Sequence, residues 1–140
     1  MPTIFTRIID GDIPGIFVWR DDTCVAIMSK DPLAPGHALV VPIVEVDHWL
    51  DLDAATAAHL TEVAQTIGRA QMAAFVPEKV GLMIAGLEVP HVHLHVVPIN
   101  GVHDLDFTRA RIDEDPALVR AAAEQIRTAL RAQGATGVAE

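Results

Sequence analysis

The chain has 140 residues, of which 51% are hydrophobic and 21% are charged, a composition that fits one globular domain rather than a disordered or fibrous chain. Its formal net charge of −9 argues against general binding to nucleic acid or to an anionic membrane surface, because both need a basic footprint. No apolar run reaches the ~20 residues of a membrane-spanning helix, and the first residues lack a basic start followed by an apolar signal segment. We therefore expect a cytoplasmic location.

The first third of the chain predicts a short helix followed by three strands. Residues 3–9 can form one or two helical turns, which end in a block rich in Gly, Asp and Pro. The apolar stretches 16–19 and 24–28 predict the two strands of a hairpin, and residues 37–42 predict a third strand. Cys24 is the only cysteine, so an intramolecular disulfide is excluded, and we expect its side chain to be a small buried apolar group.

The middle of the chain predicts one long helix and two further strands. Asp53 is a predicted helix N-cap, and from residue 54 to 75 apolar residues recur at helical spacing. Residues 80–85 predict a fourth strand, and residues 89–97 predict a fifth strand with strict alternation of polar and apolar side chains.

The last part of the chain predicts a loop, a helix and a tail. Residues 99–114 are polar and read as a loop. Asp115 as the cap and Pro116 at the first helical position open the final helix, which Gly134 ends. We expect residues 134–140 to be a loose tail.

The order of these elements indicates the fold class. Strands and helices come in separate blocks, without the regular alternation that builds a parallel sheet. This favours a single α+β domain over residues 1–140, with an antiparallel sheet of about five strands and helices packed on one side. The fifth strand should lie at or next to the centre of the sheet.

Three histidines alternate with apolar residues in the fifth predicted strand. Because successive side chains of a strand point to opposite faces, His91, His93 and His95 share one face, with alternate positions about 7 Å apart. Val92 and Leu94 point into a core. Such a row of imidazoles can perform nucleophilic or acid–base chemistry near neutral pH, or hold a metal. A purely structural role gains little from the row, because imidazoles repel one another once protonated.

The sequence around these histidines resembles the histidine triad (HIT) superfamily. Residues 91–97 read H-V-H-L-H-V-V and match its H-φ-H-φ-H-φ-φ motif, in which φ is apolar. Residues 11–14 resemble the early G-[DE]-I-P of that superfamily, and residues 34–42 resemble its P-G-H-x-L-V-x-P strand. The similarity covers residues 3–98 and is closest to the Hint-like branch of nucleoside phosphoramidate hydrolases.

The resemblance implies an activity and an assembly. The expected reaction is hydrolysis at the α-phosphate of a purine nucleoside phosphoramidate or a related nucleotide, through a covalent nucleotidyl-histidine intermediate. The expected assembly is a two-fold dimer formed by the long helix and the sheet edge, and no cofactor is expected.

The resemblance also assigns roles to four histidines. His93 would be the nucleophile, with one ring nitrogen bare and the other donating a hydrogen bond, for example to a backbone carbonyl. His95 would donate to the phosphoryl oxygens as charge develops, His37 would add an imidazole from a neighbouring strand, and His91 would support the others. Uridylyltransferase relatives have Gln at the third motif position, so His95 favours a hydrolase.

Five further positions correspond to nucleotide-binding positions of the superfamily, and several depart from its pattern. Leu87 stands where a phosphate-binding Gln is expected, and leucine cannot donate a hydrogen bond. Glu88 or a backbone N–H would then replace that contact. An Asn position falls on Val80, and Ser29 replaces an Asp or Asn that binds the ribose hydroxyls. Leu39 is the remaining expected nucleotide contact.

A zinc site is not expected. Zinc-bearing members of the superfamily carry C-x-x-C near the N-terminus, where this chain has Thr3 and Thr6 at the same spacing. The other two ligand positions, His48 and His91, are present, but two imidazoles alone rarely form a structural zinc site.

Three alternatives remain open. A dinucleoside polyphosphate hydrolase would use the same nucleophile with a different leaving group. A nucleotide-binding module with little catalysis is suggested by the polar residues lost at positions 29, 80 and 87. A metalloenzyme could use the histidine row as its ligands.

Overall fold

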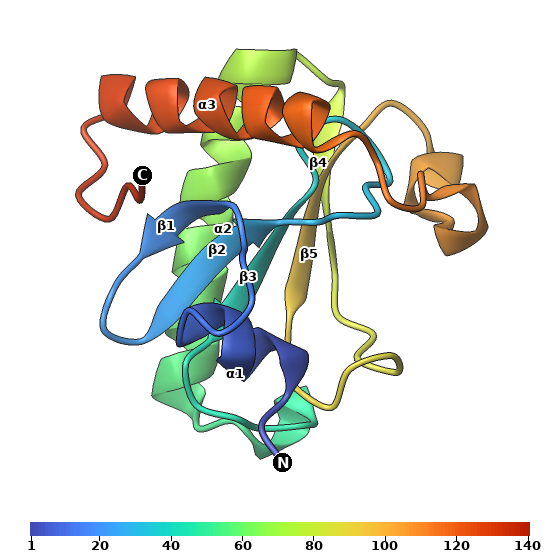
Figure 1. Cartoon of the computed structure of the whole chain (residues 1–140). Coiled ribbons are helices and arrows are strands. Elements are labelled where there is room, and N and C mark those ends of the chain that lie inside the picture. The colour runs from blue at the N-terminus through green and yellow to red at the C-terminus, as the bar shows by residue number, and fades with distance from the viewer.

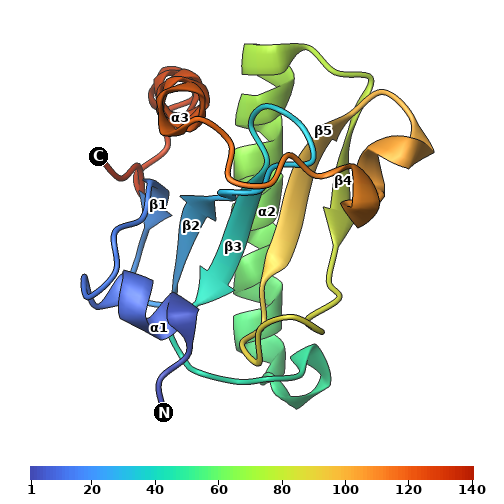
Figure 2. The ribbon, with the colours of Figure 1, turned by 45° about the vertical axis from the view of Figure 1, so that its right-hand side comes forward.

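A twisted antiparallel sheet forms the centre of the molecule in the computed structural model, which describes residues 1–140 (Figure 1). Its five strands lie in the order β1-β2-β3-β5-β4, as Figure 2 shows. The strands are β1 (Phe17–Arg20), β2 (Cys24–Met28), β3 (Ala38–Pro42), β4 (Lys79–Met83) and β5 (Leu94–Ile99). The predicted α+β class and five antiparallel strands are confirmed, and β5 lies next to the central strand β3.

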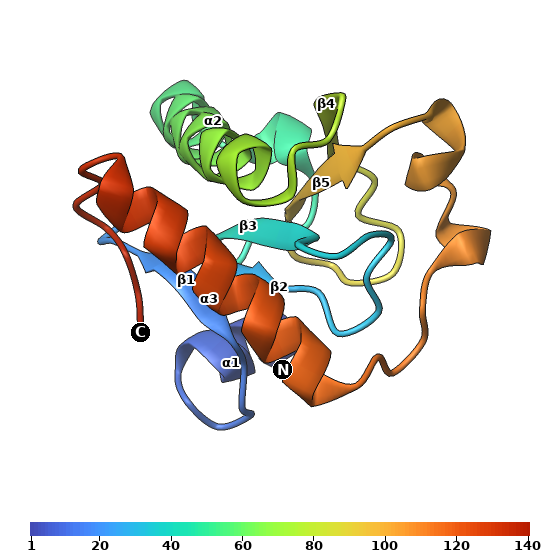
Figure 3. The ribbon, with the colours of Figure 1, turned by 90° about the horizontal axis from the view of Figure 1, so that it is seen from above.

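Helices cover both faces of the sheet. The long helix α2 (Ala54–Phe75) packs on one face, while the short helix α1 (Ile4–Ile9) packs on the other, as the view from above shows (Figure 3). Helix α3 (Pro116–Ala132) crosses one end of the sheet and contacts α2 and β1 (Figure 1). Three short 3₁₀ helices complete the chain: η1 (Trp49–Asp51), η2 (Val102–Leu105) and η3 (Phe107–Arg109). No helix is both long and apolar enough to cross a membrane.

The expectation of helices on one side only is wrong for α1. Strands β2 and β3 are buried along their whole length, so their apolar side chains need cover on both faces. Phe5 and Ile9 of α1 supply it by packing on Val25, Ile27 and Leu39. The larger core lies on the α2 side, where it includes Leu60, Ile67, Val92, Leu94, Val96, Ile126 and Leu130.

The predicted cap residues begin the two long helices. The Asp53 carboxylate accepts from the Thr56 N–H at 2.7 Å, and the Asp115 carboxylate accepts from the Ala117 N–H at 2.9 Å. Each carboxylate satisfies an N–H group that has no partner inside the helix.

The fifth strand begins later than its sequence pattern predicts. Only His95 of the three alternating histidines lies in β5, while His91 lies at a bend and His93 in the irregular segment that leads into the strand. Pro42 at the end of β3 has no N–H to donate, and the Val92 N–H donates instead to the Val46 carbonyl at 2.8 Å. The ladder between β3 and β5 therefore ends before it reaches the first two histidines.

The C-terminal tail is bound to the sheet, so the expectation of a loose tail over 134–140 is wrong. Strand β1 is an edge strand with free backbone groups. Its Arg20 N–H donates to the Gly137 carbonyl at 2.9 Å, and its Val18 carbonyl accepts from the Ala139 N–H at 3.0 Å. Val138 thereby forms an isolated bridge with Trp19.

Gly36, which precedes His37 just before β3, has no room for a side chain. Its φ angle of 90° lies in the left-handed region, and a Cβ atom there would collide with the ring of Phe75 at the end of α2. We expect Gly36→Ala to lower the free energy of unfolding by about 2–4 kcal/mol, since backbone strain adds to the collision.

Gly11 provides the matched control, because its φ angle is 86° and no atom lies within 4 Å of the place that a Cβ atom would take. Gly11→Ala should therefore lower the free energy of unfolding by the cost of backbone strain only, without a collision. Equal losses of both variants in urea denaturation would contradict a close approach of Phe75 to Gly36.

Candidate functional site

Four histidine side chains lie together on the face of the sheet opposite α2. His95 of β5 stands directly across from Leu39 of β3 and Met83 of β4, so these three side chains share that face. The rings of His93 and His95 are 4.9 Å apart between centroids, and the ring of His37 is 5.2 Å from that of His95. The side chains of Val92 and Leu94 point the other way, into the core under α2. The predicted alternation is therefore preserved, although only part of it is strand.

The backbone fixes the tautomer of His93. Nδ1 of His93 lies 2.8 Å from the carbonyl oxygen of His91. Because a carbonyl oxygen only accepts, we assign the ring proton to Nδ1, which leaves Nε2 with a free lone pair. Nε2 has no hydrogen-bond partner in the protein. It is accessible to solvent, because the only buried side-chain nitrogen or oxygen atom of the chain without a partner is Oε1 of Gln71. This assignment makes Nε2 the bare nitrogen of the His93 ring.

A directional chain of hydrogen bonds fixes the tautomers of His37 and His95. The backbone N–H of Leu33 donates to Nδ1 of His37 at 3.0 Å, so the proton of this neutral ring lies on Nε2. Nε2 of His37 then donates to Nδ1 of His95 at 3.0 Å. The proton of His95 is left on its own Nε2, which has no protein partner. His95 therefore presents an N–H donor next to His93, whose ring carries the lone pair; the centroids of the two rings are 4.9 Å apart.

Burial keeps the donor and its partner neutral. Burial lowers the pKa of His37 to about 3, helped by the neighbouring charges that His95 and His93 would carry if protonated. Burial also lowers the pKa of His95 to about 4, again helped by His93. At neutral pH both rings are uncharged, which is the state that the hydrogen-bond chain requires.

His91 anchors the segment that carries His93. Its Nε2 donates to the carbonyl of Pro42 at 2.7 Å, at the end of β3. Its Nδ1 accepts from the hydroxyl of Thr3 at 2.7 Å, and Thr3 is the N-cap of α1. Its ring is fully buried, and burial lowers its pKa. Both ring nitrogens of His91 are occupied, and its backbone carbonyl accepts the hydrogen bond from Nδ1–H of His93.

Two phenylalanines flank the histidines, and neither was predicted from the sequence. The ring of Phe5 lies 4.9 Å from that of His93, and the ring of Phe107 lies 5.0 Å from that of His95, both edge to face. Phe5 is signalled by its place on the apolar side of a short helix. Phe107 stands alone in a polar loop, where no periodic pattern could identify it.

The predicted nucleotide-binding residues are only partly brought to this face. Leu39 is there, opposite His95. Ser29 lines a cavity of about 250 Å³ with His37 and Arg111, but His93 and His95 do not line it. Val80 pairs with Pro98 and faces α2, on the wrong side of the sheet for a contact with the histidines.

Two other predicted residues, Leu87 and Glu88, lie exposed in the loop before the histidines. Leu87 is 95% exposed, and neither side chain makes a hydrogen bond. The structure therefore brings neither of them to the ring nitrogens.

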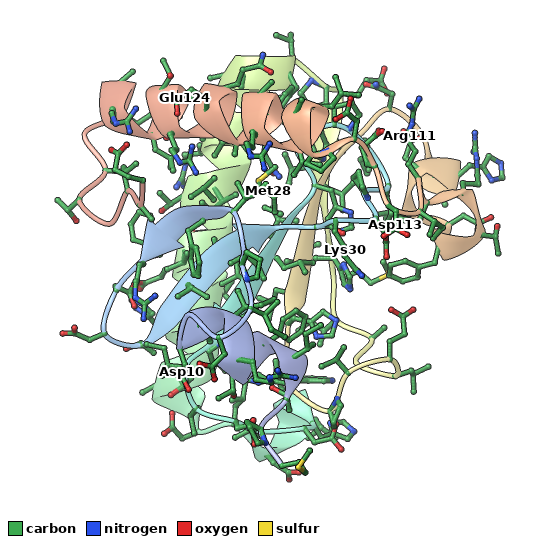
Figure 4. The ribbon with its side chains drawn as sticks, in the orientation of Figure 1. Asp10, Met28, Lys30, Arg111, Asp113 and Glu124 are labelled. Carbon is green, nitrogen blue, oxygen red and sulfur yellow. The ribbon has the colours of Figure 1, made fainter.

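The C-terminal part of the chain closes over the loop between β2 and β3. The Asp113 N–H donates to the carboxylate of Asp31 at 2.8 Å, and the Glu114 N–H donates to the carbonyl of Lys30 at 3.1 Å. Figure 4 shows Lys30 and Asp113 together on this side of the molecule. The segment that follows Phe107 is thus fixed to the loop that leads into His37.

One group of side chains has the composition of a metal site, and it lies outside the histidine row. Asp21, Cys24 and His59 place one ligand atom each within 4.8 Å of one another. The Asp21 carboxylate already accepts from His59 Nε2 at 2.7 Å, from the Trp19 indole at 2.8 Å and from two backbone N–H groups. These bonds hold the pKa of Asp21 well below its usual range and explain the group as a structural link between a hairpin and α2.

Comparison with known proteins identifies the family of this chain. The profile of the HIT domain matches residues 10–102. The chain belongs to the HIT family. The match covers the hairpin, α2 and all three motif histidines, so the resemblance found in the sequence is confirmed.

Relatives support the same placement. The chain is 33% identical over 103 residues to an uncharacterized HIT-like protein of Mycobacterium tuberculosis, which covers 70% of this chain and 72% of that protein. It is 26% identical over 100 residues to the adenylylsulfatase HINT3 of Arabidopsis thaliana, which covers 68% of this chain and 51% of that protein.

Solved structures agree with the fold. A Zn-bound histidine triad family protein from Mycobacterium smegmatis matches with a TM-score of 0.81 and 28% identity over 94% of both chains. A hypothetical histidine triad nucleotide-binding protein from Sulfolobus tokodaii matches with a TM-score of 0.80 and 25% identity over 91% of both chains. This HIT-family chain therefore has the architecture of nucleotide-binding, hydrolase-like proteins.

The neutral state of the buried histidines predicts an acid-sensitive fold. His95 has a pKa of about 4 in the folded chain against its usual 6.5, so between these values the unfolded chain binds more protons. Stability therefore falls as the pH falls from about 6.5 to 4, by at most about 1.4 kcal/mol per pH unit for each such proton.

We expect His95→Gln, whose side chain stays neutral, to make this decline shallower in urea denaturation at a series of pH values. The exposed His103 is the control, and His103→Gln should keep the wild-type slope. An unchanged slope in His95→Gln would contradict the neutral state of His95.

Proposed function

We propose that this HIT-family chain hydrolyses a purine nucleoside phosphoramidate, or a related nucleotide, at its α-phosphate through a covalent intermediate on His93. The observation that carries this proposal is the 2.8 Å hydrogen bond from Nδ1 of His93 to the His91 carbonyl. It leaves the lone pair of Nε2 free and directs it into the site. One relative, the adenylylsulfatase HINT3, supports an adenylyl group as the nucleotide part of the substrate.

In the first step of the proposed reaction, the lone pair of His93 Nε2 attacks the α-phosphorus and forms a P–N bond. The bond to the leaving amine breaks, and the amine departs with the electron pair and takes up a proton. Water then attacks the phosphorus of the nucleotidyl-histidine and gives up a proton, which balances the proton taken up by the amine. The bond to Nε2 breaks, its electron pair returns to Nε2, and a nucleoside monophosphate is released. Covalent catalysis of this kind divides one difficult displacement into two easier ones.

The neighbouring groups have separate roles in this proposal. The ring of His93 gains positive charge as Nε2 bonds to phosphorus, and the His91 carbonyl stabilises that charge through Nδ1–H. His95 donates its Nε2–H to a non-bridging phosphoryl oxygen, and His37 keeps that proton in place. His91 acts as a support, as expected from the sequence.

The nucleoside part is proposed to lie along the same face, against Leu39 and near Ser29. The roles of Leu87 and Glu88 at the phosphate stay predictions. Their exposed loop offers backbone N–H groups in place of the missing Gln side chain.

The geometry supports a phosphoryl-transfer site better than a metal centre built from the histidine row. Both nitrogens of His91 are occupied by Pro42 and Thr3, and Nδ1 of His95 is occupied by His37. A shared ion would need three converging bare nitrogens, and the row offers one at His93. We therefore propose a metal-independent reaction.

Turnover of three substrates tests the proposal: adenosine 5′-phosphoramidate, adenosine 5′-phosphosulfate and a diadenosine polyphosphate. We expect His93→Ala to lower kcat by about 10³-fold or more, because the nucleophile is lost. The control His103→Ala should keep wild-type activity, and a chelator should have no effect on the wild type. Mass spectrometry of quenched enzyme should find the nucleotidyl group on the peptide with His93.

Each other outcome points to one alternative. Turnover of only the diadenosine polyphosphate would identify a dinucleoside polyphosphate hydrolase with the same nucleophile. Protection of the fold from heat by a nucleotide, without turnover above the His93→Ala level, would indicate a binding module. Activity lost with chelator and restored by a metal would contradict the proposed mechanism.

We also propose that the chain forms a two-fold homodimer through β4 and α2. Strand β4 is the free edge of the sheet, and an apolar groove of about 360 Å³ lies between it and α2. Met72 and Leu82 line this groove and are 40% and 51% exposed. Unpaired strand edges with apolar neighbours are suited to pairing with a second copy.

A charge in this groove should separate the two copies. We expect Leu82→Asp to convert the dimer to a folded monomer in sedimentation velocity, because a carboxylate would be buried without a partner. Leu118 on α3 is 57% exposed outside the groove, and Leu118→Asp is the control that should stay dimeric. A wild-type chain that sediments as a monomer would overturn the proposal.

A further inference from the structure

Gln71 is a fully buried polar residue in the middle of the α2 face that covers the sheet. Its Nε2 donates to the carbonyl of Gly36 at 2.9 Å and to the carbonyl of Val96 at 2.8 Å. Its Oε1 has no hydrogen-bond partner and is the only buried side-chain atom of the chain in that state. The side chain is thus used entirely as a double donor.

The two carbonyls belong to the residues next to His37 and His95. Gly36 directly precedes His37, and Val96 directly follows His95. The ladder between β3 and β5 ends at the pair Ala38 and Val96, so the strands separate beside His37. No backbone N–H donates to the Gly36 carbonyl, which makes Gln71 its partner in the protein. The amide therefore bridges the two strands where their own pairing has ended.

We propose that Gln71 is a positioning residue that holds His37 and His95 at hydrogen-bond distance from the opposite face of the sheet. Nε2 of His37 and Nδ1 of His95 are 3.0 Å apart, and a hydrogen bond weakens when this donor–acceptor distance grows. If the strands separate, Nδ1 of His95 loses its donor, and the ring can move its proton from Nε2 to Nδ1. The phosphoryl oxygens would then face a lone pair in place of a donor.

The unpartnered Oε1 supports this role. A buried acceptor without a donor costs about 1–3 kcal/mol, a cost that an apolar residue at this position would avoid. An apolar residue would however break the bridge to both carbonyls. The neighbouring stripe positions Ile67, Ala70 and Ala74 are apolar, so the amide is an exception within the helix face that packs on the sheet.

The test compares Gln71→Met, which keeps the volume and removes the donors, with Gln133→Met at the exposed end of α3, outside both the histidine face and the groove beside β4. Nitrogen-15 NMR of the histidine rings reports the tautomers directly. We expect wild type and Gln133→Met to hold the His95 proton on Nε2, and Gln71→Met to give a mixture of both tautomers. Because this readout needs no substrate, it tests the positioning role even if the proposed function fails.

Kinetics provide the second readout, which depends on the proposed function. We expect Gln71→Met to lower kcat by about 10- to 100-fold with little change in KM, since the donor acts as charge develops on the phosphoryl oxygens. In a His37→Ala background the same substitution should have almost no further effect on kcat, because Gln71 acts on the tautomer of His95 through His37. Gln133→Met should leave kcat unchanged in both backgrounds.

Two results would overturn the proposal: an unchanged His95 tautomer in Gln71→Met, or a loss of kcat that is equal in the wild-type and His37→Ala backgrounds. If Gln71→Met does not fold, Gln71→Asn is measured in the same way. Asparagine keeps the amide but is one methylene too short to reach both carbonyls, so it should give the same mixture of tautomers. Loss of turnover in every variant and in wild type, with the tautomers as expected, would sink the proposed function and leave the positioning role intact.

Discussion

The histidine cluster depends on backbone groups whose hydrogen-bonding direction cannot be reversed. The Leu33 N–H can only donate and the His91 carbonyl can only accept, so each fixes the tautomer of the ring it meets. The first sets His37, which sets His95, and the second sets His93. The outcome is one free lone pair beside one N–H donor, at Nε2 of His93 and Nε2 of His95. Imidazoles alone could not impose this order, because a neutral imidazole can donate or accept at either nitrogen.

The packing of α2 makes these backbone groups available. The close contact of Phe75 with Gly36 and the double donor at Gln71 fix the start of β3 from the α2 side of the sheet. The opposite side receives α1, whose N-cap residue Thr3 donates to His91. Burial between these layers lowers the pKa values of the rings. The histidine site is therefore built from the same packing contacts as the core. Few of its residues could be substituted without disturbing a contact of the core.

Much of this arrangement could be predicted from the sequence, for identifiable physical reasons. Local patterns with strong periodicity gave accurate elements: β2 at 24–28 and α2 at 54–75 have the predicted bounds, and Asp53 is the predicted cap. The common face of the histidines follows from alternation and holds even outside the strand. The rest depends on long-range contacts that leave no periodic signal. Phe107 reaches His95 from a polar loop, and residues 137–139 pair with β1 because that edge is open. Gln71 could have been singled out from the sequence, because it is a polar residue within the apolar face of the predicted helix.

The acidity of the chain and the neutrality of the site fit together in the proposed reaction. With a net charge of −9 the molecule has no general attraction for anions, and His37 and His95 add no positive charge at neutral pH. At the histidine row, the phosphate of a bound nucleotide would meet hydrogen-bond donors that carry no charge. Positive charge appears on His93 only as its Nε2 bonds to phosphorus, at the moment when negative charge builds on the phosphoryl oxygens. Interactions that strengthen only in the transition state raise kcat, whereas a permanent cation would also bind the ground state and the product. Neutral imidazoles held by the backbone therefore suit a hydrolase that must release a nucleoside monophosphate after each turnover.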